Sequence, residues 1–205
     1  MLPAVPVVIS EHSSGIRAEH RKLKKECYIY NMNVAEIKTN DIANGEGVRT
    51  SLFVSGCRHC CPDCFNAMAG DFKYGKPFTE KTEKEILDSI HYPWIAGLSI
   101  LGGEPFEPEN QEALLKLVRN FKKEYPNKTI WCYSGFTIEE IAGEIPSRAK
   151  TDISLQLLKE IDILVDGRFE KELKNITLKF RGSENQRVID IQKTLKEKEI
   201  ILYLN

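Results

Sequence analysis

Long hydrophobic runs are missing from this sequence, and so is an excess of charge of one sign. No apolar stretch approaches the roughly 20 residues that a membrane-spanning helix requires. The 29 Lys and Arg residues nearly balance the 30 Asp and Glu residues, which leaves a net charge of −1 at pH 7. This balance gives no electrostatic reason to expect nucleic acid or an anionic membrane as a partner. The apolar residues 1–9 contain two prolines and lack a basic segment before them, so we do not interpret them as a signal peptide.

Cysteines are few but clustered, because four of the six lie between positions 57 and 64. This clustering differs from the cysteine pattern of a secreted disulfide framework. Clustered thiols in a cytosolic chain are more often metal ligands. The cysteine pattern therefore predicts a metal-binding protein of the reducing cytoplasm. The length of 205 residues is enough for one well-buried domain and short for two.

The beginning of the chain differs in character from the rest. We divide the sequence into an N-terminal extension, 1–31, and one domain, 32–205. The extension joins an apolar start to a run of charged residues at 17–26. It is either a basic docking arm, a leader without a role in chemistry, or a segment upstream of a natural start at Met32. We favour the last interpretation, because regular patterning begins just after Met32.

Strand-like and helix-like segments alternate through the domain. Short runs rich in Ile, Val and aromatic residues predict strands at 34–38, 51–54, 98–101, 129–133 and 161–165. Thr82 and Glu85 have the spacing of a capping box, which predicts a helix start. Pro108 opens a second stretch with apolar residues at helical spacing. Shorter helices are expected after Thr137 and at 154–160.

This alternation predicts an α/β fold with a mainly parallel sheet. A complete eightfold β/α barrel needs about 250 residues, so the domain would form only a partial, open barrel. The tail at 200–204 is apolar and is interpreted either as an edge strand or as an interface.

The most informative motif follows the predicted strand at 51–54. Cys57, Cys61 and Cys64 have the spacing C-x3-C-x2-C on one short loop. A cubane iron–sulfur cluster has four iron corners, so three local thiolates leave one iron free to bind a group other than protein. Open coordination at a metal indicates chemistry rather than a structural role.

Three more candidate loops follow predicted strands, namely 102–105 (GGEP), 134–135 (SG) and 166–167 (DG). Ligands gather at the carboxyl ends of strands in open α/β sheets, so we expect these loops to meet the cysteine loop at one rim. Gly102 and Gly103 would let a ligand approach the backbone closely, and the carboxylate of Glu104 would receive a cationic group. Taken alone, this segment is more often a plain turn.

The cysteine loop together with the GGE segment resembles the radical S-adenosylmethionine (SAM) superfamily. More narrowly, the sequence resembles the anaerobic ribonucleotide reductase activating proteins, in order from about Met32 to Ile191. The segments that carry this resemblance are 44–50 (NGEGVRT), 56–66 (GCRHCCPDCFN), 131–135 (WCYSG), 164–167 (LVDG) and 181–186 (RGSENQ).

The resemblance implies the cofactors and the residues that hold them. Cys57, Cys61 and Cys64 would bind a 4Fe–4S cluster whose fourth iron chelates the amino and carboxylate groups of SAM. The segment Gly102, Gly103 and Glu104 matches the family segment that helps to bind the methionine amino group.

Three further residues are candidates for the SAM pocket. Phe65 stands where many radical SAM proteins carry an aromatic residue near the adenine, and simple packing is its alternative. Ser134 and Asp166 would line the pocket, with a plain turn and a strand-end cap as their alternatives.

The resemblance also implies the reaction and the partner. One electron delivered to the cluster cleaves SAM into methionine and a 5′-deoxyadenosyl radical. That radical removes hydrogen from a glycine Cα of the anaerobic ribonucleoside-triphosphate reductase. A flavodoxin or a ferredoxin is the expected electron donor. The cofactors carry the radical chemistry, so no catalytic side chain is assigned, and an open sheet suits a substrate that is a loop of another protein.

Other assignments stay open from the sequence alone. One alternative is a different small radical SAM enzyme, either another glycyl-radical activase or a deazapurine-type synthase. A structural zinc module is a second, because the four clustered thiols match the number that tetrahedral zinc binds. A pure electron carrier is a third. Cys60 and His59 are interpreted as passive loop residues, and Cys132 as a core residue.

Overall fold

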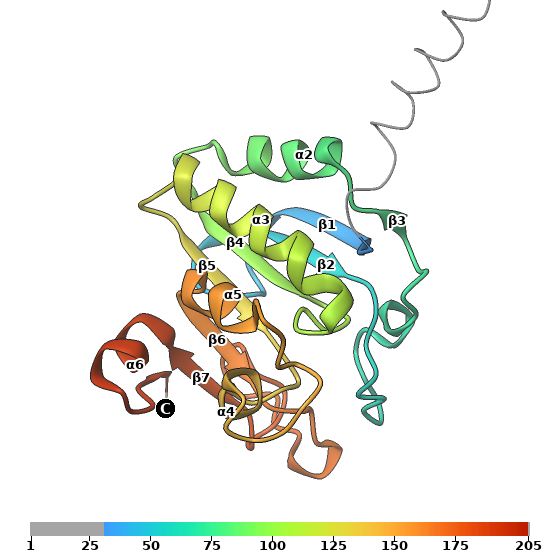
Figure 1. Cartoon of the computed structure of the whole chain (residues 1–205), viewed down its shortest axis with the longest axis vertical. Coiled ribbons are helices and arrows are strands. Elements are labelled where there is room, and N and C mark those ends of the chain that lie inside the picture. The colour runs from blue at the N-terminus through green and yellow to red at the C-terminus, as the bar shows by residue number, and fades with distance from the viewer. Residues whose placement is uncertain (1–30, 205) are drawn as a thin grey trace, which may run out of the picture.

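The alternating pattern of the sequence forms one eight-stranded sheet in the structure, a computed structural model that describes residues 31–204 (Figure 1). The strands are β1 (Asn33–Asp41), β2 (Val48–Val54), β3 (Lys76–Pro77), β4 (Ile95–Gly102), β5 (Thr129–Tyr133), β6 (Ile163–Asp166), β7 (Arg187–Asp190) and β8 (Leu202–Leu204). Their order across the sheet is β3-β1-β2-β4-β5-β6-β7-β8, with β3 and β8 as the outer strands, so the sheet is open. The predicted extension 1–31 lies, except for Asn31, outside the described residues.

Only the centre of this sheet is parallel. The pairs β2–β4, β4–β5 and β5–β6 are parallel, whereas the pairs toward both edges are antiparallel. A parallel pair needs a long crossover, and a short connection allows only an antiparallel neighbour. The six residues between β1 and β2 are such a short connection. The prediction of a mainly parallel sheet is therefore confirmed for the centre and wrong for the edges.

Helices supply the crossovers of the central strands. These crossover helices are α2 (Glu80–Ile90), α3 (Pro108–Glu124), α4 (Ile138–Ala142) and α5 (Ser154–Glu160). A further helix, α6 (Ile191–Glu197), connects β7 to β8, and η1 (Ala67–Gly70) and η2 (Lys171–Leu173) are short 3-10 helices. The helices α3 and α5 begin where the sequence predicts, and Thr137 caps α4 in a complete capping box with Glu140. The predicted start of α2 is wrong, because Thr79 is the cap and its side chain accepts from the backbone N–H of Thr82.

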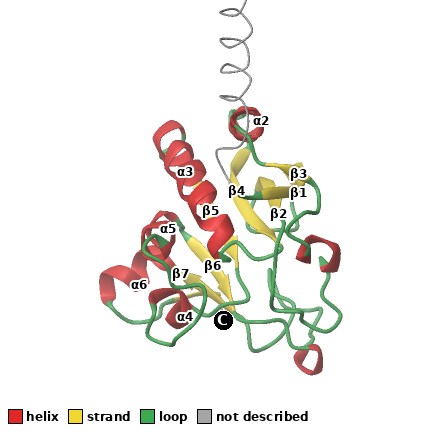
Figure 2. Ribbon diagram, turned by 45° about the vertical axis from the view of Figure 1, so that its right-hand side comes forward, coloured by secondary structure: helices red, strands yellow, loops and turns green. Residues whose placement is uncertain are grey.

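The two faces of the sheet bury different side chains. In β5, Ile130 and Cys132 join the large core beneath the helices, so the prediction for Cys132 is confirmed. The intervening Trp131 faces a second, smaller cluster with Val165 and Val188. Figure 2 shows α3 and α5 lying on one side of the strands. A strand between two apolar layers alternates in this way because successive side chains point to opposite faces.

The C-terminal part adds elements that the sequence analysis did not predict, namely β7 and α6. The residues 202–204 form β8, which pairs with β7 at the sheet edge. This confirms the edge-strand interpretation of the tail.

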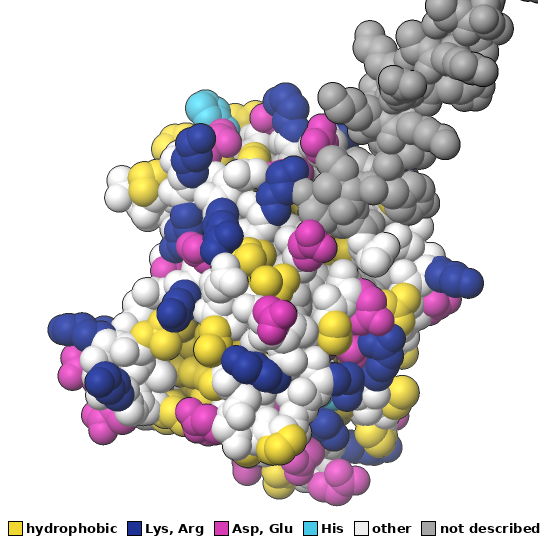
Figure 3. Space-filling view, viewed as in Figure 1, with side chains coloured by type: hydrophobic (Ala, Val, Ile, Leu, Met, Phe, Trp, Pro, Cys, Tyr) yellow, Lys and Arg dark blue, Asp and Glu magenta, His cyan; other side chains and the backbone are white. Residues whose placement is uncertain are grey.

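No helix within residues 31–204 is long and apolar enough to cross a membrane. On the face drawn in Figure 3, basic and acidic side chains are interspersed. This mixture agrees with the near balance of charges in the sequence.

Candidate metal and cofactor site

The loops that follow β2, β4, β5 and β6 meet around one cavity of about 560 Å³. This convergence at the carboxyl ends of the parallel strands confirms the prediction from the sequence. The predicted residues in its wall are Cys57, Cys61, Cys64, Phe65, Gly102, Gly103, Glu104 and Ser134. Asp166 is the one predicted site residue that does not line it.

Three of the four clustered thiols belong to this cavity. Cys57, Cys61 and Cys64 line it, whereas Cys60 does not and is exposed. Cys60 has a positive φ of 52°, which is uncommon for a residue other than glycine. Cys57 is fixed at its backbone, where its N–H donates to the carbonyl of Gly70 at 3.0 Å.

Thiols on one loop are the donors that iron–sulfur clusters use. Within residues 31–204, no three His, Cys, Asp or Glu side chains are grouped so that they could hold one metal ion. A cubane cluster requires a different arrangement of thiolates, because each thiolate of the loop binds a separate iron. Burial raises the pKa of Cys57 to about 12 and also raises that of Cys61. A metal deprotonates the thiols that coordinate it, so its binding here would release protons.

The GGE segment is hydrogen-bonded directly to the start of the cysteine loop. The N–H of Glu104 donates to the carbonyl of Gly56 at 2.8 Å. A Cβ atom on Gly103 would lie 2.6 Å from that same carbonyl oxygen and 2.8 Å from the carbonyl oxygen of Ala69. Glycine is therefore required at 103 because two backbones approach each other there.

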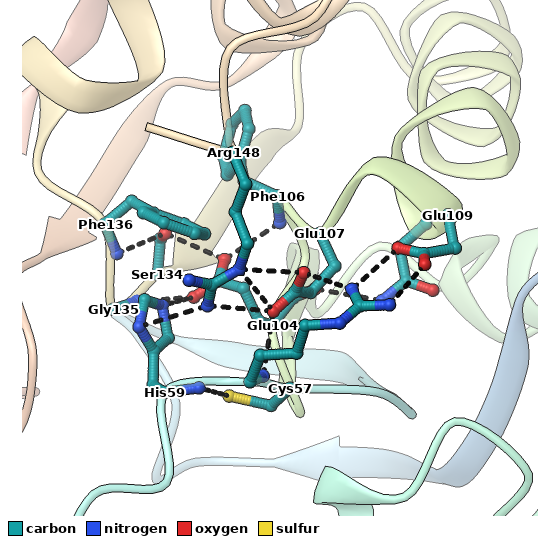
Figure 4. Close-up of polar contacts among 12 residues, drawn as sticks. Cys57, His59, Glu104, Phe106, Glu107, Glu109, Ser134, Gly135, Phe136 and Arg148 are labelled. Atoms are coloured by element: carbon teal, nitrogen blue, oxygen red, sulfur yellow. Dashed lines mark hydrogen bonds and ion pairs between the residues drawn. The ribbon is translucent and has the colours of Figure 1, made fainter. Parts of the chain in front are cut away.

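The carboxylate of Glu104 is the centre of the cavity wall (Figure 4). It is only 1% exposed. Its Oε1 accepts from Phe106 N–H and Ser134 Oγ, both at 2.8 Å. Its Oε2 accepts from Gly135 N–H at 2.7 Å and lies 3.0 Å from His59 Nε2. The protein thus fills all the usual acceptor positions of this carboxylate, and a cationic ligand group would have to replace one of these donors.

Phe65 and Ser134 lie in contrasting surroundings. Phe65 is 94% exposed at the cavity wall, so an aromatic surface is available there. Ser134 is buried, and its Oγ accepts from the N–H of Phe136 while it donates to Glu104. Ser134 therefore lines the cavity and also makes two structural hydrogen bonds, one with Glu104 and one with Phe136.

Asp166 lies behind the cavity wall. It is fully buried, accepts from the N–H of Ile138 at 2.8 Å, and pairs with Arg187. The guanidinium of Arg187 also pairs with Glu139 at 2.8 Å. These contacts join the end of β6 to α4 and β7. They match the role of a strand-end cap, which was the alternative to a place of Asp166 in the SAM pocket.

Sequence reasoning missed a second buried carboxylate, Glu107. It accepts from the backbone N–H of Arg58 at 2.8 Å and from Arg148 Nε at 3.0 Å. Burial by itself would raise the pKa of Glu107, but hydrogen bonds from Arg148 and Arg58 outweigh it and hold the pKa below its ordinary value. Charged loop residues are usually solvated, so the burial of Glu107 was not expected. Its position three residues after Glu104 was the only signal in the sequence that could have indicated it.

Comparison with known proteins shows which family has this site. The family model for a 4Fe-4S single cluster domain matches residues 43–189, the stretch that contains the cysteine loop and the other loops of the cavity. This match supports an iron–sulfur cluster as the cofactor.

Curated relatives narrow the assignment. The anaerobic ribonucleoside-triphosphate reductase-activating protein of Pasteurella multocida is 40% identical over 76% of this chain and 95% of its own length. The proteins of the same name from Escherichia coli K12 and Enterobacteria phage T4 are 38% and 37% identical, over 96% and 93% of their lengths. The chain belongs to the family of anaerobic ribonucleoside-triphosphate reductase-activating proteins.

The close approach at Gly103 leads to a first prediction. We expect Gly103→Ala to lower the free energy of unfolding by about 1–3 kcal/mol, because the added methyl group overpacks two backbone carbonyls. Urea unfolding of the full chain measures this change. Gly70→Ala is the matched control, since a Cβ there would lie 3.8 Å from its nearest neighbour. Equal unfolding midpoints for the two variants would contradict the predicted clash.

The Arg187 pair leads to a second prediction. Hydrogen bonds from Arg187 lower the pKa of Glu139 to about 2. A carboxyl with a lower pKa in the folded than in the unfolded chain stabilises the fold above its unfolded pKa, about 4.3, and this contribution disappears as the pH falls toward 2. We expect Glu139→Gln to cost about 1–2 kcal/mol at pH 7, because its partial exposure screens the pair, and roughly half as much at pH 3, where the folded carboxyl is still largely ionised.

Urea unfolding at pH 7, 5, 4 and 3 measures this dependence. Glu144→Gln is the control, because that side chain is exposed one turn away. A constant difference between Glu139→Gln and the unmodified chain at all four pH values would contradict the assignment.

Proposed function

We propose that this chain activates an anaerobic ribonucleoside-triphosphate reductase by generating a glycyl radical on it, with a 4Fe–4S cluster and SAM as cofactors. The observation that carries the proposal is the shared cavity, in which three thiols of one loop and the GGE segment line the same space. The names of the relatives favour this activase over a deazapurine-type synthase or a zinc module.

Each part of the cavity has a place in this proposal. Cys57, Cys61 and Cys64 would hold the cluster, and the segment Gly102, Gly103 and Glu104 at the cavity wall would receive the methionine end of SAM. When bound, the cluster and SAM together supply a 5′-deoxyadenosyl radical that takes a hydrogen atom from a glycine of the reductase. The protein's own contribution is to bind and orient these groups and to exclude competing reactions.

Phe65, with its exposed ring, would pack against the adenine, and Ser134 would complete the pocket beside Glu104. Asp166 would act on the pocket only indirectly, by holding the end of β6.

The open sheet would be the partial barrel of the radical SAM type, formed by one activase domain at 32–205. An uncovered side would admit a loop of the reductase, which a closed barrel would exclude. A flavodoxin or a ferredoxin would deliver the electron. Residues 1–31 would form an extension outside this domain, and the clustered thiols suit a reducing cytoplasm.

The function is tested by EPR spectroscopy under anaerobic conditions. The chain is reconstituted with iron and sulfide, reduced, and mixed with SAM and the reductase of the same organism. We expect a glycyl-radical doublet on the reductase. Formation of 5′-deoxyadenosine without that doublet would contradict the proposed substrate and favour another small radical SAM enzyme.

Substitution of single cysteines tests the ligand assignment. We expect Cys57→Ala, Cys61→Ala and Cys64→Ala each to lose the cluster, because a missing thiolate leaves a second iron without protein ligation. Iron content and the visible absorbance of the reconstituted chain measure this loss. Cys60→Ala is the matched control and should keep its cluster. A cluster lost in Cys60→Ala would overturn the assignment.

A further inference from the structure

His59 stands out because it lies between two proposed cluster ligands and yet points into the protein. Its side chain is only 3% exposed. Its ring packs edge-on against Phe136, with the ring centroids 4.4 Å apart. It also lies over Gly135, where a Cβ atom would approach the imidazole to 2.6 Å. The absence of a side chain at Gly135 is therefore what makes room for this ring (Figure 4).

The two polar neighbours of His59 select one neutral form of its ring. Arg148 Nη2 lies 3.4 Å from Nδ1, and a guanidinium has only donors, so Nδ1 accepts. The hydrogen is then on Nε2, which donates to Glu104 Oε2 at 3.0 Å. An ionised carboxylate has only acceptors, so both neighbours require the same tautomer.

The same arrangement holds the cysteine loop at two successive residues. Glu107 accepts from the backbone N–H of Arg58, and Glu104 accepts from the side chain of His59. Arg148 contacts both sides, since it donates to Glu107 and to the ring of His59. The two carboxylates are buried, where hydrogen bonds to a charged group are strong and costly to lose.

Farther along, the loop has a weaker tether. Lys171 pairs with Asp63 at 2.7 Å, but both side chains are more than half exposed. Exposed ion pairs of this kind contribute little. The buried contacts at Arg58 and His59 therefore add to the backbone hydrogen bond from Cys57 to Gly70 in holding the first part of the cysteine loop.

We propose that His59 is a positioning residue, which fixes the cysteine loop against the GGE segment through its hydrogen bond to Glu104. Its effect on the loop belongs to the chain itself, and only its effect on SAM rests on the proposed function. His59 touches neither the reacting atoms nor, in this proposal, the iron.

The first test is hydrogen exchange in the full chain before iron is added. With His59→Ala, we expect the hydrogen-bonded amides of residues 58 and 59 to exchange at least about tenfold faster, as the loss of a hydrogen bond to a buried charge predicts. The amides of β4 should keep their protection, which shows that the fold is intact. His91→Ala is the matched control, because this histidine is exposed at the end of α2.

A pair of conservative variants separates positioning from simple packing. The amide nitrogen of His59→Gln reaches the place of Nε2 and can donate to Glu104, whereas that of His59→Asn lies near the place of Nδ1. We expect the slow exchange at residues 58 and 59 to be restored in His59→Gln and not in His59→Asn. Unchanged exchange in His59→Ala, or equal exchange in the Gln and Asn variants, would overturn the proposal.

The second test follows the reconstituted chain. We expect His59→Ala to raise the KM for SAM at least about tenfold and to alter the EPR signal of the reduced cluster, while His59→Gln stays near the unmodified chain. A normal KM and signal in His59→Ala would contradict the positioning role. Failure of the unmodified chain to form a glycyl radical would instead contradict the proposed function and leave the exchange result intact.

Discussion

The carboxylate of Glu104 is the constraint on which the rest of the site depends. A negative charge buried to this degree is tolerated only when it is surrounded by donors, and here the donors come from three separate loops. Phe106 lies just after the GGE segment, Ser134 and Gly135 follow β5, and His59 belongs to the cysteine loop. The need to satisfy one charge thereby draws these three loops together, in addition to apolar contacts such as that of the His59 ring with Phe136. The cavity has its shape because this requirement is met from all sides.

A second buried acid, Glu107, is likewise surrounded by hydrogen-bond donors. It holds the backbone at Arg58 and is neutralised by Arg148 and Arg58. Arg148 also lies over the ring of Phe136, 4.6 Å from its centroid. Behind part of the cavity wall, the two carboxylates, His59 and Arg148 thus form one polar network, which gives directional contacts and a single arrangement when every member is paired.

The sequence predicted those features that depend on neighbours along the chain. The strand at 129–133 and the helix at 154–160 have the predicted bounds, because apolar periodicity is a local signal. The start of α2 was mispredicted, since Thr79 and Thr82 are residues of the same capping type and the helix begins three residues earlier, with Thr79 as its cap. The inward direction of His59 and the burial of Glu107 depend on Arg148, which is 89 and 41 residues away in the chain. No local pattern contains that information.

The long separation between these partners has a consequence for the order of events during synthesis. A ribosome releases the cysteine loop early, while the contact from Arg148 to the ring of His59 spans 89 residues. Contacts of such sequence separation form late, after the intervening strands and helices have folded. The thiols are therefore exposed to solvent while the loops that will form the rest of the cavity wall have not yet folded. The complete cavity is accordingly a late product of folding.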